Sequence, residues 1–290
     1  MNLKEFFNCV IRFGLDRDVR KTPGKNPYPD SALLYGDPNK EIKSILIGID
    51  MEVGELVLAE RLREREGLDL VISHHPEGIG LAGLPEVMRL QVDILVKAGV
   101  NKETARELLE ERIREVERRV IPGNITRAVD AARILDLPFL CMHTPADNHV
   151  AHFLGKLFAK EKPKKVKDIV EILKTIPEYQ DAQKDLVGPR IILGNPNRAP
   201  GKILLEMTGG TEGSKDVFDK LYKTGVRTLV SMHLSEEHLK KVKDANLNVV
   251  IAGHISSDNL GLNLLLDRIE KLAGQEFKTI CCSGFRRIRR

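Results

Sequence analysis

The chain has 290 residues, of which 42% are apolar and 30% are charged, as expected for a globular protein. The net charge of +4 is mild and aromatic residues make up only 4%, which argues against nucleic acid as a main partner. No apolar run is long enough to cross a bilayer, and the first residues lack a secretory cleavage pattern. Four cysteines without C-x-x-C spacing fit a reducing compartment, so we expect a cytoplasmic protein that is not inserted in a membrane.

The first third of the chain begins with an amphipathic pattern and continues with a βαβ pattern. Residues 1–13 alternate charged and apolar side chains and predict a helix. Residues 45–75 predict a strand, a polar turn, a helix capped by Gly67, and a buried strand that ends in His74 and His75. A βαβ unit pairs its strands in parallel through a right-handed crossover, so the pattern predicts the α/β class.

The His74–His75 pair, followed by Pro76, is the sharpest local motif. Neighbouring side chains on a strand point to opposite faces, but at a strand end next to proline both rings can turn toward one pocket. Imidazoles combined with carboxylates suit zinc, iron, manganese or cobalt. For this pair alone, an equally good explanation is that one ring bonds a loop carbonyl and the other is solvated.

Residues 102–119 predict a strongly charged helix that looks like an insertion. Its apolar positions recur every three or four residues and form one stripe. These positions are Ala105, Leu109, Ile113, Val116 and Val120. We expect this helix to pack on a neighbouring element or on another subunit, and we assign it no chemistry. A lysine-rich segment at 160–168 predicts a linker or the start of a helix.

An H-x-x-x-D-N pattern occurs twice, each time after an apolar run that predicts a strand. The first copy is His143, Asp147 and Asn148, and the second, 111 positions later, is His254, Asp258 and Asn259. In a helical turn this spacing puts the histidine and the carboxylate on one face, where they can share a metal. The alternative for either copy is that the aspartate caps the following helix. Because both copies and the histidine pair lie at strand ends, where open parallel sheets bind ligands, we favour a metal site.

A second βαβ pattern at 203–233 matches 45–75 at a constant offset of 158, which places His233 on His75. The two offsets, 158 and 111, differ, so the chain is not a simple tandem duplication. The repeats predict two similar α/β lobes, with the metal site between them at the carboxyl ends of the strands. We assign residues 1–158 plus 247–290 to the first lobe and residues 159–246 to the second.

Three polar features of the second half leave alternatives open. The segment T-G-G-T-E-G-S-K at 208–215 predicts either an anion-binding loop or a flexible turn. His233 and His238 either help to enclose a pocket or lie at a solvated helix start. The basic C-terminal F-R-R-I-R-R is either a solvated end or an oligomer contact.

These motifs resemble those of the Nif-three-like proteins, also described as dinuclear-metal-centre hexameric proteins or GTP cyclohydrolase I type 2 homologues. The family pattern is a strand ending in H-H-P, a later H-x-x-x-D and a C-terminal G-H-x-x-x-E, in the order found here at 73–76, 143–147 and 253–258. The resemblance covers residues 30–270, including the G-G-T-E-G loop. This chain has Asp258 where the family usually has glutamate, which is one methylene longer.

The resemblance implies two divalent metal ions, zinc, iron or manganese, and a hexamer with metal sites facing an inner cavity. It assigns the metal ligands to His74, His75, Asp147, His254 and Asp258. We therefore expect a metal-dependent hydrolase that acts on a small molecule. A nucleotide or related heterocycle as substrate follows from the family's description alone.

Within such a site, His143 or His149 would move protons, because imidazoles titrate near neutral pH. The alternative function is a non-catalytic, metal-binding regulator or metal carrier that acts as an oligomer. A third, nucleic-acid-associated function has little support from the charge and aromatic content.

Overall fold

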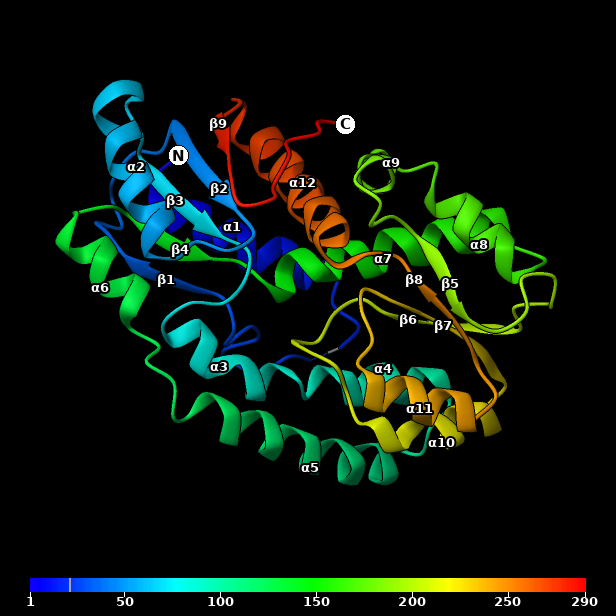
Figure 1. Ribbon diagram of the computed structural model, residues 1–290. Coiled ribbons are helices and arrows are strands. Elements are labelled where there is room, and N and C mark those ends of the chain that lie inside the picture. The colour runs from blue at the N-terminus through cyan, green and yellow to red at the C-terminus, as the bar shows by residue number, and fades with distance from the viewer. Residues whose placement is uncertain (21) are drawn as a thin grey trace.

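The computed structural model describes residues 1–20 and 22–290 and contains two mixed sheets (Figure 1). The first sheet has the strand order β1-β4-β3-β2-β9, and the second has the order β5-β8-β7-β6. The strands of the first sheet are β1 (Ala32–Tyr35), β2 (Ser44–Gly48), β3 (Leu70–Ser73), β4 (Phe139–Cys141) and β9 (Lys278–Cys281). Those of the second are β5 (Arg190–Leu193), β6 (Lys202–Glu206), β7 (Val226–Ser231) and β8 (Asn248–Ile251). Strands β1 and β5 are antiparallel to their neighbours, and all other pairs are parallel.

The two sheets are copies of one unit. The order β1-β4-β3-β2 matches β5-β8-β7-β6, and both predicted βαβ units have parallel strands. One small contact is also duplicated: the Ser73 hydroxyl donates to the carbonyl of His75 at 2.8 Å, and the Ser231 hydroxyl donates to that of His233 at 2.7 Å. The predicted α/β class, with two similar units, is thus confirmed.

An insertion in the first unit explains why the two sequence offsets differ. The connection between β3 and β4 holds four helices, whereas the equivalent connection between β7 and β8 holds one, α11 (Glu236–Asp244). The four helices are α3 (Ile79–Val87), α4 (Leu90–Ala98), α5 (Lys102–Val120) and α6 (Arg127–Ile134). The offset is therefore 158 before this connection and 111 after it.

Two of the inserted helices, α4 and α5, cover the second sheet, whereas α6 packs on the first. The apolar stripe predicted for the charged helix is buried in α5 from Ala105 to Val116, and Val120 is half-buried beside it. This stripe joins Leu95 of α4 and Leu229 of β7 in one hydrophobic cluster. The prediction that the helix packs on a neighbouring element is therefore confirmed, and the neighbour is the second unit of the same chain.

Two long helices, α7 (Thr144–Glu161) and α12 (His254–Ala273), pack against one another between the sheets (Figure 1). Apolar residues of α12 join the core of the first sheet, while Val150 and Leu154 of α7 join the core of the second. Each of these helices directly follows a strand end, after β4 and β8, respectively. Their first turns, which carry the H-x-x-x-D-N motifs, therefore meet in the space between the two sheets.

The crossing of α7 and α12 depends on a glycine one turn after Asp258. A Cβ atom at Gly261 would lie 2.7 Å from the backbone oxygen of Ala146 and 2.9 Å from Val150. These contacts are shorter than side chains tolerate, so any larger residue must push the two helices apart.

We expect Gly261→Val to lower the free energy of unfolding by roughly 2 kcal/mol, because the helix crossing is overpacked. The same displacement separates Asp147 from Asp258, so metal affinity should fall as well. Urea unfolding measures the first effect. Gly54→Ala is the matched control, because its Cβ meets nothing within 4 Å and it should be neutral or stabilising. Equal stability of Gly261→Val and wild type would contradict this description of the crossing.

The remaining helices complete the two units. Helix α1 (Leu3–Leu15), predicted from the amphipathic N-terminal pattern, buries its apolar face in the core of the first sheet, and α2 (Val53–Glu66) covers the other face. The other helices are α8 (Val166–Leu173), α9 (Pro177–Lys184), α10 (Phe218–Lys223) and a short 3-10 turn (Lys215–Val217). None of the helices described is long and apolar enough to cross a membrane.

Two predictions about the C-terminal part of the chain are corrected by the structure. The predicted lobe boundary at residue 247 divides the second sheet, because β8 pairs with β7 and only β9 returns to the first sheet. The basic C-terminal segment is not simply a solvated end, because the side chain of Arg287 is only 5% exposed and pairs with Asp267 and Glu270 of α12.

Candidate metal centre

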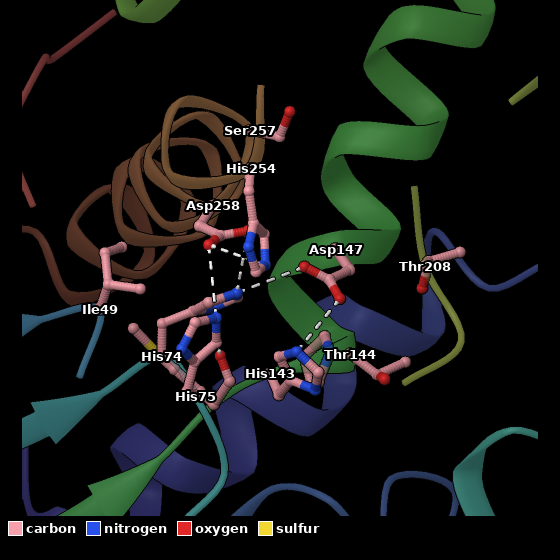
Figure 2. A network of polar contacts seen from close by, with 12 residues as sticks. Ile49, His74, His75, His143, Thr144, Asp147, Thr208, His254, Ser257 and Asp258 are labelled. Carbon is pink, nitrogen blue, oxygen red and sulfur yellow. Dashed lines mark hydrogen bonds and ion pairs between the residues drawn. The ribbon is translucent and has the colours of Figure 1, made fainter. Parts of the chain in front are cut away.

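The backbone of β3 continues past the strand end and delivers both histidines to one place. The N–H groups of His74 and His75 donate to the carbonyls of Gly48 and Ile49 at 3.0 and 2.9 Å. The His74 side chain is fully buried, while that of His75 is 25% exposed. Their ring centroids lie 5.3 Å apart, and both rings face the first turns of α7 and α12 (Figure 2).

Three of the imidazoles have an oxygen atom within hydrogen-bonding distance of Nδ1, which orients the ring. The Nδ1 atom of His74 lies 3.2 Å from the carbonyl oxygen of Met142. His75 Nδ1 lies 2.7 Å from Asp50, and His143 Nδ1 lies 2.8 Å from Asp30. A ring that donates its Nδ1 proton to such an oxygen presents the lone pair of Nε2, the form in which histidine binds metals.

Asp147 and Asp258 lie among these rings, Asp147 in the first turn of α7 and Asp258 just after the first turn of α12. The Nε2 atom of His74 is 3.5 Å from Asp147 and 3.4 Å from Asp258. The second oxygen of Asp258 is 3.5 Å from His75 Nε2 and 3.6 Å from His254 Nε2. Asp258 thus reaches three imidazoles (Figure 2), even though it is shorter than glutamate.

These separations are too long for hydrogen bonds but suit ligands that share a cation. Four buried atoms of the centre have no hydrogen-bond partner among the described residues: His74 Nε2, Asp147 Oδ1 and both carboxylate oxygens of Asp258. Buried polar atoms are rarely left unpaired. Two ligand atoms that each lie about 2.1 Å from one tetrahedral zinc ion are separated by about 3.4 Å. The donor set and its spacing therefore fit divalent metal ions.

The ligand atoms form three overlapping groups in which all atoms lie within 4.8 Å of one another. The groups are His74, His75 and His143; His75, His254 and Asp258; and His74, Asp147 and Asp258. All five predicted metal ligands are brought together. His143, predicted as a proton carrier, lies in the same cluster, with its Nε2 atom 3.7 Å from Asp147.

The electrostatic environment of the centre favours positive charge. Burial raises the pKa of Asp147 to about 6, a cost that a nearby cation would offset. Burial also acts to raise the pKa of Asp258, but His74 and His75 beside it hold that pKa well below its usual range. Burial lowers the pKa of His254 to about 4, which keeps its ring neutral and able to bind a metal.

The structure does not bring His149, the other predicted proton carrier, to this cluster. Its Nδ1 atom lies 2.8 Å from the carbonyl oxygen of Pro145, and its Nε2 atom lies 3.4 Å from Arg268. The ring is buried on the side of α7 that faces α1, where it has a packing role. Its surroundings give no route to a ligand at the metal centre.

His149 should instead contribute to the pH dependence of stability. Burial lowers its pKa from near 6.5 to about 4, so below pH 6.5 the unfolded chain binds a proton that the folded chain does not. The free energy of unfolding should therefore fall by up to roughly 3 kcal/mol as the pH drops through this range. We expect His149→Gln to reduce that fall in urea unfolding at a series of pH values. An unchanged pH profile would contradict this description of His149.

A second wall, supplied by the second sheet, faces the centre across a cavity of about 40 Å³. Glu206 is the last residue of β6, and Glu212 lies on the predicted G-G-T-E-G loop. The ring centroid of His233 lies 4.8 Å from that of His254. Glu212 accepts from the N–H of Ser235 at 2.6 Å and lies 3.5 Å from His233 Nδ1. His233 therefore helps to enclose the pocket, which was one of its two predicted roles.

The G-G-T-E-G loop is held in place by the inserted helices. Gln91 of α4 donates to the carbonyls of Gly209 and Thr211 at 2.7 and 2.6 Å, and Arg112 of α5 donates to that of Glu212 at 3.0 Å. The loop carbonyls thus accept hydrogen bonds from side chains of α4 and α5. These contacts fix the loop, so they do not favour the flexible turn, and they give no support to the anion-binding loop.

Two carboxylates that support the centre were missed from the sequence. Asp30 is fully buried and accepts from the Thr144 hydroxyl at 2.6 Å while holding His143. Asp50, which follows β2, orients the ring of His75 through the contact with its Nδ1 atom. The only local signal was the position of Asp50 just after an apolar strand; Asp30 is more than 100 residues from its partners and has no such signal.

The comparisons with known proteins agree with the fold of this chain. A solved structure described as a NIF3 superfamily protein from Sphaerobacter thermophilus matches with a TM-score of 0.78 and 27% identity, over 93% of this chain and 96% of that one. The chain is a NIF3-like protein. The family predicted from its motifs is thus confirmed.

More distant NIF3-like folds extend the same architecture. Reduced HcgD from Methanocaldococcus jannaschii matches with a TM-score of 0.57 and 18% identity, over 97% of both chains. A protein of unknown function called ybgI matches with a TM-score of 0.53 and 14% identity, over 98% of both chains. At these identities the likeness shows the fold alone. No protein-family model and no curated protein matches the sequence.

Proposed function

We propose that this NIF3-like protein is a metal-dependent hydrolase with two divalent metal ions in the centre. The observation that carries the proposal is the position of Asp258. Its two oxygens face different imidazoles, at 3.4 Å from His74 and 3.5 Å from His75, and both are buried without a hydrogen-bond partner among the described residues. A carboxylate shared in this way is typical of two-metal hydrolytic sites.

The residues around the centre would bind and orient the reacting groups. When bound, divalent metals there would supply a Lewis acid and an acidified water. Asp30 fixes the ring of His143 from behind, so its Nε2 atom is held toward the carboxylate of Asp147. On the opposite wall, Thr208, Thr211 and His233 line the same cavity and can contact a substrate.

The cavity limits the part of a substrate that can enter. A volume of about 40 Å³ accommodates one or two small groups, whereas pockets for whole drug-sized ligands occupy roughly 300–1,000 Å³. We therefore propose that only the bond to be hydrolysed enters the centre while the rest of the molecule stays outside. A nucleotide remains compatible with this arrangement only if it binds by one end.

The same small volume favours the second candidate, a metal carrier or metal-binding regulator without catalysis. Such a protein needs the ligands of the centre but no room for a substrate. Self-association into a hexamer is a further proposal that belongs to both candidates, and light scattering of the purified chain measures it.

A panel of phosphate esters, carboxylate esters and amides tests the hydrolase proposal on protein loaded with zinc, iron or manganese. We expect hydrolysis that depends on metal and is lost in His74→Ala, while His152→Ala, outside the cluster, retains activity. A fully metal-loaded protein that hydrolyses none of these compounds would contradict the hydrolase proposal and leave the carrier as the supported function.

A further inference from the structure

A second, larger cavity lies beneath α7, on the far side of its first turn from the metal centre. Its volume is about 390 Å³, and α4, α7, β6 and the segment after α1 line it. Thr208 lines both cavities, and its hydroxyl donates to the side-chain oxygen of Asn148 at 2.7 Å. This hydrogen bond separates the two cavities, so the larger one, here called the α7 groove, is distinct from the metal centre.

The floor of the α7 groove is an apolar sheet edge left uncovered. Strand β2 of the first sheet is fully buried, and β9 pairs along its outer edge. Its counterpart β6 pairs only with β7 among the described residues, and its residues from Ile203 to Leu205 are half-buried. Ile94 of α4 faces the same space. The duplicated architecture thus leaves an apolar surface in the second unit where the first unit has a strand.

The rim of the α7 groove carries cations without carboxylate partners. Arg17, Lys97 and Lys202 all line the cavity, and none of them forms an ion pair with a residue that the structure describes. The two aspartates nearby are already engaged: Asp16 pairs with Arg268 at 2.5 Å, and Asp18 pairs with Arg20 at 2.7 Å. The unbalanced charge facing the groove is therefore positive.

His152 lies close to these cations. Its ring lines the groove, and its Nε2 atom lies 3.4 Å from Arg17 Nη1. Burial lowers the pKa of His152, and the charges of Arg17, Lys156 and Lys97 lower it further. The ring is consequently neutral near pH 7 and accepts from Arg17, which orients that guanidinium at the rim.

A glycine in the middle of α7 keeps the groove open. Gly155 has an ordinary helical backbone, and a Cβ atom there would meet only Leu205, at a comfortable 3.7 Å. Neither backbone conformation nor packing therefore requires glycine, which costs about 1 kcal/mol relative to alanine inside a helix. Its effect on the structure is to leave space above the apolar floor.

We propose that the α7 groove is a binding site for a small molecule that combines an apolar body with an anionic group. The body lies on the half-buried edge of β6 under Gly155, and the anion faces Arg17 and Lys97. The volume falls within the range of small-molecule pockets, and the floor and rim match the two parts of such a ligand. The site goes beyond the proposed hydrolase and does not require metal at the centre.

Two fluorescent dyes with the same aromatic body test the proposal on the whole chain. Anilinonaphthalene sulfonate carries an anion, and phenylnaphthylamine lacks it. We expect the sulfonate to bind at one site per chain and about 10-fold more tightly than the neutral dye, because two cations face its anion. The double variant Arg17→Gln/Lys97→Gln should remove that difference. Lys160→Gln, an exposed lysine of the same helix outside the groove, should leave it unchanged.

A cavity-filling variant tests the position of the site separately. Gly155→Leu should abolish binding of both dyes without lowering the thermal unfolding midpoint. Sulfonate binding that is equal in wild type, Gly155→Leu and the double charge variant would overturn the proposal. Failure of Gly155→Leu to fold would leave the decision to the double charge variant, whose surface changes do not affect the core.

Discussion

Replacing Asp258 with asparagine is expected to remove most metal from the centre and to lower metal affinity at least about 100-fold. Asp258 belongs to two of the three ligand groups, and its oxygens approach His74, His75 and His254 within 3.6 Å. Asparagine has nearly the same shape but lacks the charge and presents one oxygen instead of two. The substitution therefore tests the chemistry of the centre more than its packing.

Competition with a chromogenic zinc chelator measures the affinity of the wild-type protein and of Asp258→Asn. Asp244→Asn, at an exposed position of α11, is the matched control and should bind metal like the wild type. We expect Asp50→Asn to lower metal affinity by an intermediate amount. Its carboxylate contacts Nδ1 of His75 and is not itself one of the proposed metal ligands. Equal affinity of Asp258→Asn and wild type would contradict the assignment of Asp258.

Arg287→Ala is expected to lower the free energy of unfolding by roughly 3 kcal/mol, the largest effect on stability that we predict. The Arg287 side chain is only 5% exposed and lies 2.6 Å from Asp267 and 2.7 Å from Glu270. It also donates to the side-chain oxygen of Asn263 at 3.2 Å. Its removal leaves Glu270, which is 8% exposed, without its main partner.

Urea unfolding compares Arg287→Ala with Arg286→Ala, the neighbouring arginine in the same segment. Arg286 pairs with Asp185 at the surface, where both side chains are more than half exposed, so its loss should cost less than about 1 kcal/mol. Similar effects of the two substitutions would show that the C-terminal segment does not stabilise α12 as described.

The sequence allowed much of the fold and of the centre to be predicted, because the relevant signals are local. The βαβ units showed as apolar runs separated by a capped helix, and the repeated H-x-x-x-D-N motif placed Asp147 and Asp258 near the starts of two helices. The histidine pair at 74–75 followed a buried strand directly. Each of these patterns depends on residues within one or two helical turns, which a single sequence displays.

The parts that could not be predicted depend on contacts between distant segments. Asp30 holds His143 across more than 100 residues, and Gln91 holds the loop at Gly209 in the same way. The position of β8 in the second sheet follows from pairing with β7, which the apolar run at 248–251 does not specify. His149 shared the local pattern of the site residues, and only its tertiary contact with Arg268 separates it from them.

The most direct test of the central claim is the metal content per chain of protein purified without added metal. Wild type is compared with His74→Ala, Asp147→Ala and His254→Ala by elemental mass spectrometry. We predict about two divalent ions per wild-type chain and a clear loss in each variant, as expected for a centre in which ligands are shared. Folded wild-type protein that holds no metal, even after incubation with zinc, iron or manganese, would contradict the account of this centre.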